Sequence, residues 1–167
     1  VVSLGFAAFL FLLIALPISF WSVAGGSDSS KARFLVAISN LFLTSQLILR
    51  WWQSGHFPIS NLYESLCFLS WGLTFGQLLL EKEYQSPIIP AVSNPIILLT
   101  MGFACFALPE DLRLSSNLVP ALRSSWLIMH VTVVMLSYAA LIIGSLLSAS
   151  VLLIAEKQPL QIRSNSF

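Results

Sequence analysis

The stretch WLIMHVTVVMLSYAALIIGSLLSASVLLIA, from Trp126 to Ala155, decides the fold of this chain because it runs for 30 residues without a charged side chain. As an α-helix it would be about 45 Å long, at a rise of 1.5 Å per residue. The hydrocarbon core of a bilayer is roughly 30 Å thick, so the stretch is long enough to cross it. It predicts a transmembrane helix.

The composition extends this conclusion to the whole chain. Hydrophobic residues make up 57% of the sequence and charged residues 9%, against about 25% charged residues in an average soluble domain. The charges form short clusters that separate apolar runs of spanning length. We therefore predict an all-α polytopic membrane bundle, a single transmembrane domain over residues 1–167 with about five spans, at 1–24, 34–52, 62–80, 88–108 and 126–155.

Several function classes are disfavoured at this level. The net charge of +1 argues against a nucleic-acid partner, which needs a basic surface. Cys67 and Cys105 lie in apolar runs without a Cys-x-x-Cys pair, which argues against a thiol–disulfide relay or a zinc site. The chain starts at Val1 and ends in a short polar tail, so we expect it to be a fragment of a longer protein.

Polar and small residues inside the spans predict contacts between helices. In a membrane, such residues hydrogen-bond across helices or allow close backbone approach. Gly72 and Gly76 lie four residues apart in the third span, as in a small-xxx-small packing face. In the second span, the expected interhelical hydrogen-bonding residues are Asn40, Thr44, Ser45 and Gln46.

The fourth span is the least regular. Asn94-Pro95 resembles a helix cap followed by proline at the first helical position, which predicts a helix from Pro95 to Leu108. Fourteen residues reach only about 21 Å, so residues 87–93 must supply the remaining depth, as a kinked extension or a broken segment. The following connection, residues 109–125, could hold a short amphipathic helix on the membrane surface.

Two motifs flank the connection between the second and third spans. Arg50-Trp51-Trp52 is typical of an interfacial anchor, with Arg50 extending to the headgroups, although the paired tryptophans could instead stack on a flat ligand. Asn61 followed by Glu64 fits a helix capping box, whose side chains satisfy free backbone N–H groups.

The two histidines are the candidate functional residues. His130 lies four residues after Trp126, about 6 Å deeper along a helix. An ionisable residue inside a membrane helix indicates a functional site, and imidazole is the residue that proteins use to hold haem iron. The alternative is a neutral His130 that ties helices together. His56 lies in a polar loop, where a histidine is more often solvated than a ligand.

The predicted helix over 126–155 has one stripe of polar or small residues, which we expect to face protein rather than lipid. Its members are Trp126, His130, Ser137, Gly144 and Ser148.

The distribution of basic residues predicts the orientation in the membrane. Five spans place two sets of Lys and Arg on opposite sides. The larger set, expected in the cytoplasm or stroma, is Lys31, Arg33, Lys82, Lys157 and Arg163, and the smaller set is Arg50, Arg113 and Arg123. Both histidines and the tryptophans at positions 51, 52 and 126 then share the opposite, lumenal or periplasmic, side.

Two stretches carry a resemblance to a known family. They are GHFPISNLYESLCFLSW, from Gly55 to Trp71, and SWLIMHVTVVMLSY, from Ser125 to Tyr138. Together they resemble the CcsA (ResC) family of cytochrome c biogenesis proteins, of the cyanobacterial and chloroplast type, and specifically the N-terminal portion. The Trp-x-x-x-His spacing followed by Ser-Tyr is similar to the wider family of haem-handling membrane proteins.

The resemblance implies a function at the haem attachment step of c-type cytochrome biogenesis. With a ResB-type (CcsB) membrane protein, the chain would present haem b, as bound substrate, to apocytochrome c on the lumenal face. His130 would correspond to one of two axial histidine ligands of the iron, with Trp126 and His56 as further haem-binding candidates. The second axial histidine and a tryptophan-rich loop would lie beyond Phe167.

The resemblance also sets expectations for activity and location. The two-protein assembly would be the cytochrome c synthase, of which this chain is one subunit. The membrane would be the thylakoid of a cyanobacterium or chloroplast, or a bacterial plasma membrane. The alternative from the residues alone is a non-catalytic permease or assembly subunit in which His130 is structural.

Overall fold

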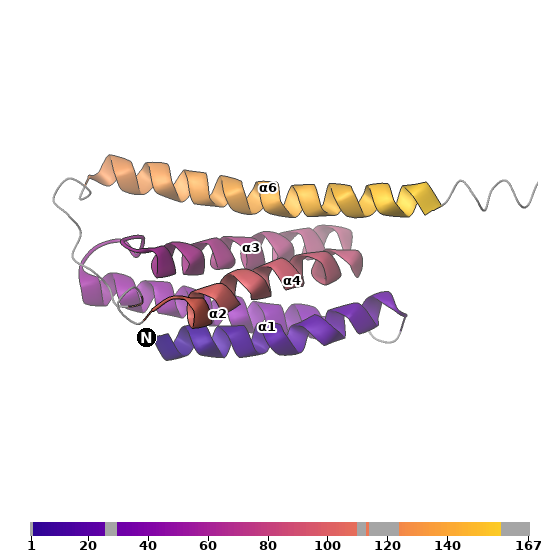
Figure 1. Ribbon diagram of the computed structural model, residues 1–167, viewed down its shortest axis with the longest axis horizontal. Helices are drawn as coiled ribbons and strands as arrows, with labels where there is room; N and C mark the ends of the chain where they lie inside the picture. The colour runs from indigo at the N-terminus through magenta and orange to yellow at the C-terminus, as the bar shows by residue number, and fades with distance from the viewer. Residues whose placement is uncertain (1, 26–29, 110–112, 114–123, 158–167) are drawn as a thin grey trace, which may run out of the picture.

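The computed structural model describes residues 2–25, 30–109, 113 and 124–157, which form a bundle of long helices (Figure 1). Its elements are α1 (Val2–Val23), α2 (Ser30–Ser54), α3 (Leu62–Tyr84), α4 (Ile88–Gly102), the π-helical η1 (Phe103–Ala107) and α6 (Ser125–Lys157). No strand occurs in these ranges. The prediction of an all-α bundle is confirmed. The amphipathic helix expected within residues 109–125 falls almost entirely outside the described residues.

Four of the helical segments are long and apolar enough to cross a membrane: α1, α2, α4 with η1, and α6. The chain is therefore a multi-pass membrane protein. Helix α3 has 23 residues but a more polar sequence. Three of its polar side chains are buried inside the bundle, with Glu64 and Gln77 at 0% exposure and Glu81 at 3%. Helix α3 thus lies among the other helices with its polar side inward.

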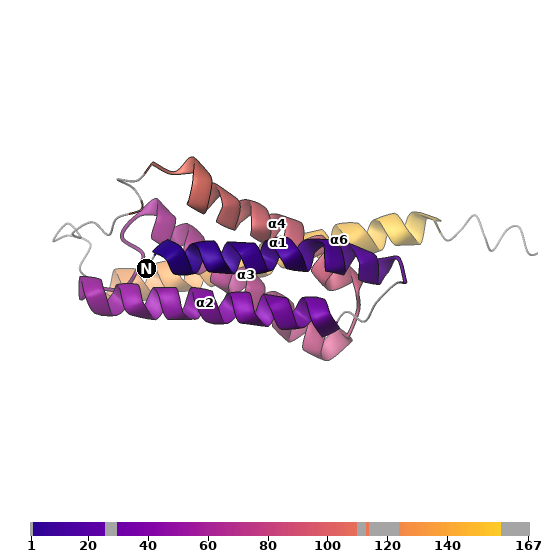
Figure 2. The same cartoon turned by 90° about the horizontal axis from the view of Figure 1, so that it is seen from below.

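Successive helices run in alternating directions, so that alternate connections lie at the same end of the bundle (Figure 1). The α2–α3 connection, the end of η1 and the start of α6 share one end. Helix α6 lies against α3 on the side away from α1, as the view from below also shows (Figure 2). The two histidines therefore lie at the same end, as the alternation of spans predicts.

Hydrogen bonds between α2 and α3 confirm most of the expected interhelical contacts. Asn40 donates to Oγ1 of Thr74 (2.7 Å) and to the carbonyl of Trp71 (3.2 Å). Thr44 accepts a hydrogen bond from the indole N–H of Trp71 at 2.9 Å. Ser45 is the exception, because its hydroxyl donates to a carbonyl of its own helix. These bonds fix the register of the two helices.

Helix α4 corrects the predicted start of the fourth helix. It begins at Ile88 and continues through Asn94 and Pro95. Asn94 does not cap the helix; its side chain donates to Oγ of Ser19 in α1 at 2.6 Å. A buried amide needs a partner, and α1 provides one. Residues 88–93 therefore form a continuous helix with the residues that follow Pro95. This extension supplies the length that a helix from Pro95 to Leu108 would lack.

Helices α3 and α6 approach closely at the predicted glycine face. A Cβ atom on Gly72 would lie 3.3 Å from Cβ of Ala139, and one on Gly76 would lie 2.9 Å from Cδ1 of Ile143. Ala139 and Ile143 are the buried residues of α6, each 3% exposed. This contact orients α6.

The stripe of polar and small residues on α6 is exposed among the described residues. The contact of α6 with α3 is made through Ala139 and Ile143, because the α3 glycines admit these side chains most closely. The expectation that the stripe faces protein stays a prediction.

Gly5 marks the closest approach of α1 to the polar interior. A Cβ at this position would lie 2.7 Å from the Tyr63 hydroxyl, 2.8 Å from Oε1 of Gln46 and 2.9 Å from Cε of Met101. The Gln46 amide also donates to the Tyr63 hydroxyl at 2.8 Å. Four helices, α1 to α4, therefore meet at a point where there is no room for a side chain at Gly5.

We predict that Gly5→Ala destabilises the protein by about 1–3 kcal/mol through overpacking. Gly144→Ala is the matched control, because nothing lies within 4 Å of a Cβ at Gly144. Alanine there gains helix propensity, by up to about 1 kcal/mol. Thermal unfolding of the detergent-purified full-length protein measures both. Equal midpoints for the two variants would contradict the close packing at Gly5.

Candidate functional site

The first turns of α6 carry the candidate ligand His130. Its ring stacks on the indole of Trp126, with ring centroids 5.6 Å apart and an angle of 4° between the planes. The spacing of four residues puts both side chains on one face of the helix. Trp126 is 68% exposed and His130 is also exposed.

This stack leaves the edge of the imidazole accessible. Trp126 covers a ring face, whereas the nitrogens that bind metals or protons lie on the ring edge. Among the described residues, no hydrogen bond or ion pair of the His130 ring is present. The described residues also contain no cluster of three or more His, Cys, Asp or Glu side chains that could hold a metal ion. His130 is therefore a single available nitrogen ligand.

The depth of His130 follows from the contact between α3 and α6, which run side by side (Figure 1). Gly72 lies beside Ala139. Glu64 is eight residues before Gly72, and His130 is nine before Ala139, so both lie about 12–14 Å from that contact along their helices. His130 is thus nearly level with Glu64.

Glu64 belongs to a buried ion pair. Its Oε1 accepts a hydrogen bond from Nη1 of Arg50 at 2.9 Å, and the side chains are 0% and 6% exposed. Its Oε2 accepts from the backbone N–H and the hydroxyl of Ser60, at 2.8 and 2.7 Å. The backbone N–H of Glu64 donates to Oδ1 of Asn61 at 2.8 Å, which confirms the predicted helix cap.

Arg50 has a different role from the predicted anchor. The guanidinium does not extend to the headgroups; it lies 4.7 Å over the Tyr63 ring and donates through Nη2 to the carbonyl of Arg113 at 2.5 Å. Arg113 in turn donates to the carbonyl of Leu108 at 2.8 Å. One buried cation therefore joins the end of α2, the start of α3 and the chain after η1. The sequence carried a signal for this ion pair, because Arg50 and Glu64 lie on either side of one short connection and must therefore lie at similar depth in the membrane.

His56 lies in the α2–α3 connection at the same end of the bundle as His130. It is half-buried, with Nδ1 3.2 Å from the carbonyl of Phe57. In the described part of the chain, no contact joins the two histidines. The structure therefore brings them to one end without forming a shared ligand set.

An aromatic row lies beside this connection. The Trp51 ring meets Phe57 (centroids 5.3 Å apart), Phe57 meets Phe68 (5.8 Å), and Phe68 meets Trp71 (5.5 Å). Trp52 takes no part and is 84% exposed. The tryptophan pair is thus divided: Trp51 packs into the row, while Trp52 remains at the surface.

The fold and the site define a multi-pass membrane protein with an accessible histidine at one end of its helical bundle. Residues 59–167 match the family model described as Cytochrome C assembly protein. The chain belongs to this family.

Curated relatives agree with the family match. The chain is 73% identical over 167 residues to "Cytochrome c biogenesis protein CcsA" of Prochlorococcus marinus (strain NATL2A), covering 100% of this chain and 53% of the relative. It is 61% identical over 166 residues to the protein of that name from Synechococcus sp. (strain CC9902), covering 99% of this chain and 55% of the relative. The chain therefore spans about half the length of these relatives. No solved structure matches it.

We predict that removing one partner of the buried ion pair destabilises the protein by about 3–5 kcal/mol, because the other charge stays buried without its partner. Arg50→Met and Glu64→Leu are the single variants. The double variant should cost less than the sum of both, by a coupling of about 0.5–3 kcal/mol. Unfolding of the purified full-length protein measures this.

The control for the ion pair is Glu83→Gln, at an exposed position of the same helix. It should change stability little, because surface substitutions stay within about 0.5 kcal/mol. Strictly additive effects of the Arg50 and Glu64 substitutions would show that the pair makes no direct energetic contribution.

Proposed function

We propose that this chain is part of a protein that acts in c-type cytochrome maturation at the haem attachment step. In this proposal His130 is an axial ligand of haem iron on the lumenal or periplasmic face. The haem, of the b type, is a bound substrate that is passed to apocytochrome c. A ResB-type (CcsB) membrane protein is the partner. The membrane is the thylakoid, or the plasma membrane of a bacterium.

The observation that carries the proposal is the exposed imidazole of His130 with its edge free and its face against Trp126. A neutral imidazole nitrogen is a common axial ligand of haem iron. The flat indole orients the ring, so that less side-chain freedom is lost when the ligand binds. The residues present therefore fit one side of a haem iron.

The position of His130 suits the transfer of haem to a soluble acceptor. A ligand in the closed interior of the bundle could not be reached by a water-soluble apoprotein, whereas His130 is exposed and lies near the start of α6. Haem supplies its own redox and vinyl chemistry when bound. The contribution of this chain is to hold and orient it.

The alternative reading, a permease or assembly subunit with a structural His130, expects the imidazole to tie helices together. Among the described residues, the one ring contact of His130 is with Trp126 of its own helix, and no hydrogen bond joins the ring to another helix. The spectroscopic test below separates the two readings.

We predict that His130→Ala in the full-length protein, purified with its ResB-type partner, abolishes haem retention without unfolding the bundle, since alanine is a good helix former. The visible absorption spectrum measures retention. Added imidazole should restore the haem bands by occupying the vacated position. Equal haem bands in the wild type and the variant would refute the assignment.

Two further variants sharpen the test of His130. Ser137→Ala changes another exposed residue of α6, two turns away, and should leave the spectrum unchanged. His56→Ala tests the second candidate; we expect the haem bands to persist, because no contact joins His56 to His130 among the described residues. Loss of the bands in His56→Ala would instead add His56 to the ligands.

We also predict that Trp126→Ala weakens haem binding about 2- to 12-fold, whereas Trp126→Phe retains most of it. The basis is that an aromatic stack contributes roughly 0.5–1.5 kcal/mol beyond area burial. Haem titration of the full-length protein gives the affinity, and the reduction potential gives a second measure of iron ligation. Equal loss in both variants would show that the indole acts through more than its flat face.

A further inference from the structure

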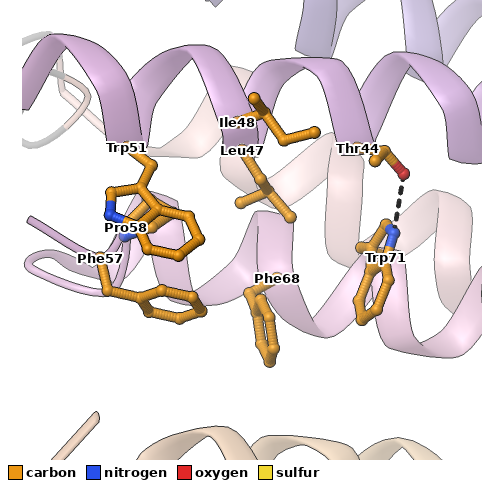
Figure 3. Close-up of a pocket in the computed structure, with 8 residues that line it drawn as sticks. All are labelled: Thr44, Leu47, Ile48, Trp51, Phe57, Pro58, Phe68 and Trp71. Atoms are coloured by element: carbon orange, nitrogen blue, oxygen red, sulfur yellow. Dashed lines mark hydrogen bonds between the residues drawn. The ribbon is translucent and has the colours of Figure 1, made fainter. Parts of the chain in front are cut away.

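A cavity of about 150 Å³ lies between the end of α2, the α2–α3 connection and the first turns of α3. Figure 3 shows its eight lining residues, with the rings of Trp51, Phe57, Phe68 and Trp71 around it. Pro58 and Leu47 complete the inner wall and are buried. The aromatic row of Trp51, Phe57, Phe68 and Trp71 therefore lines a cavity that is large enough for a small ligand.

The lining is apolar in character because its polar groups are engaged or lie at the rim. The Trp71 indole N–H donates to Oγ1 of Thr44 at 2.9 Å, the bond drawn in Figure 3. The Thr44 hydroxyl donates to the carbonyl of Asn40 at 2.8 Å. The indole N–H of Trp51 belongs to a side chain that is 53% exposed. Apolar cavities of this size exclude water and bind small apolar molecules.

The opening of the cavity lies on a membrane-spanning helix. Ile48 and Trp51 form this rim and are 55% and 53% exposed, on a helix long and apolar enough to cross a bilayer. From Thr44 to Trp51 the cavity extends about 10 Å along α2. Phe68 lies one turn deeper than Glu64, and hence deeper than the level of His130. The Ile48 side of the opening therefore lies deeper along the bundle than Arg50 and its partner Glu64, toward the hydrocarbon, whereas Trp51 lies at their level.

The size of the cavity limits its ligand. A space of about 150 Å³ accommodates one benzene-sized apolar group. A porphyrin is several such rings in extent and does not fit. A hydrocarbon chain fits, because it can enter by its end and leave its remaining length in the bilayer.

We propose that this cavity is a lipid site that takes the end of an acyl chain from the surrounding bilayer. The bound chain lies against Phe57 and Pro58, which belong to the α2–α3 connection, and against Phe68 of α3. Occupancy therefore stabilises the connection that also carries His56 and Ser60, the latter bound to the buried carboxylate of Glu64. The site is independent of haem binding.

The test uses the full-length protein in nanodiscs of phosphatidylcholine, with or without bromine atoms on the acyl chains, which quench tryptophan on contact. Fluorescence from Trp71 is taken as the difference between a protein and its Trp71→Phe variant. We expect brominated lipid to reduce the Trp71 signal at least 2-fold. Ile48→Phe places a larger side chain at the rim and should abolish this quenching.

Leu41→Phe is the matched control, since Leu41 is also exposed, at 65%, and lies two turns from Ile48 on the same face of α2. It should leave the quenching of Trp71 unchanged. Absence of quenching in the wild type would overturn the proposal. This is the result expected if the cavity stays empty or is covered by protein. Equal quenching in Ile48→Phe and Leu41→Phe would overturn it too, because the lipid contact would then lie outside the cavity.

Discussion

The ion pair between Arg50 and Glu64 is the constraint on which the arrangement of the site end depends. Removing two charges from water is costly, and close pairing with further hydrogen bonds is needed to offset that cost. The chain supplies these hydrogen bonds from Ser60, before α3, and from the carbonyl of Arg113, after η1. The Tyr63 ring of α3 adds a cation–π contact with the guanidinium. Helix ends that could otherwise slide or splay are thereby held at one depth.

Helix α3 shows how the rest of the bundle follows from this pair. A helix with an acidic residue near each end is a poor candidate for contact with lipid, and α3 turns Glu64, Gln77 and Glu81 inward. Its glycines then face α6, and Asn40 and Thr44 of α2 bind its polar groups. The outer surface of the bundle is left to the more apolar helices. The polar residues that make α3 less favourable than the other helices as an isolated transmembrane segment are also part of why α2 packs on it, and its glycines are where α6 packs.

Sequence reasoning recovered the helices, the cap at Asn61 and the glycine face, because each depends on local spacing or composition. It misread residues whose partners lie far away in the chain. The Arg-Trp-Trp motif is the same whether Arg50 reaches the headgroups or a carboxylate, and the position of Glu64 across the same short connection was the signal that separates the two. Asn94 before a proline is typical of a cap, yet Ser19, 75 residues away, is its partner. The polar stripe on α6 did not indicate the face that packs on α3, because two glycines of α3 select that face.

The contrast between the two kinds of ionisable group explains why the candidate site lies where it does. At nearly the same depth, the charged pair is enclosed and hydrogen-bonded through both carboxylate oxygens of Glu64 and both Nη atoms of Arg50, whereas the imidazole of His130 is exposed and stacks on Trp126. A group that maintains architecture gains from such bonds, because each unmet bond of a buried charge is costly. A group that receives and releases a ligand needs an open position. The same end of the bundle therefore combines a rigid interior with an accessible nitrogen, as a site for holding and passing on a ligand requires.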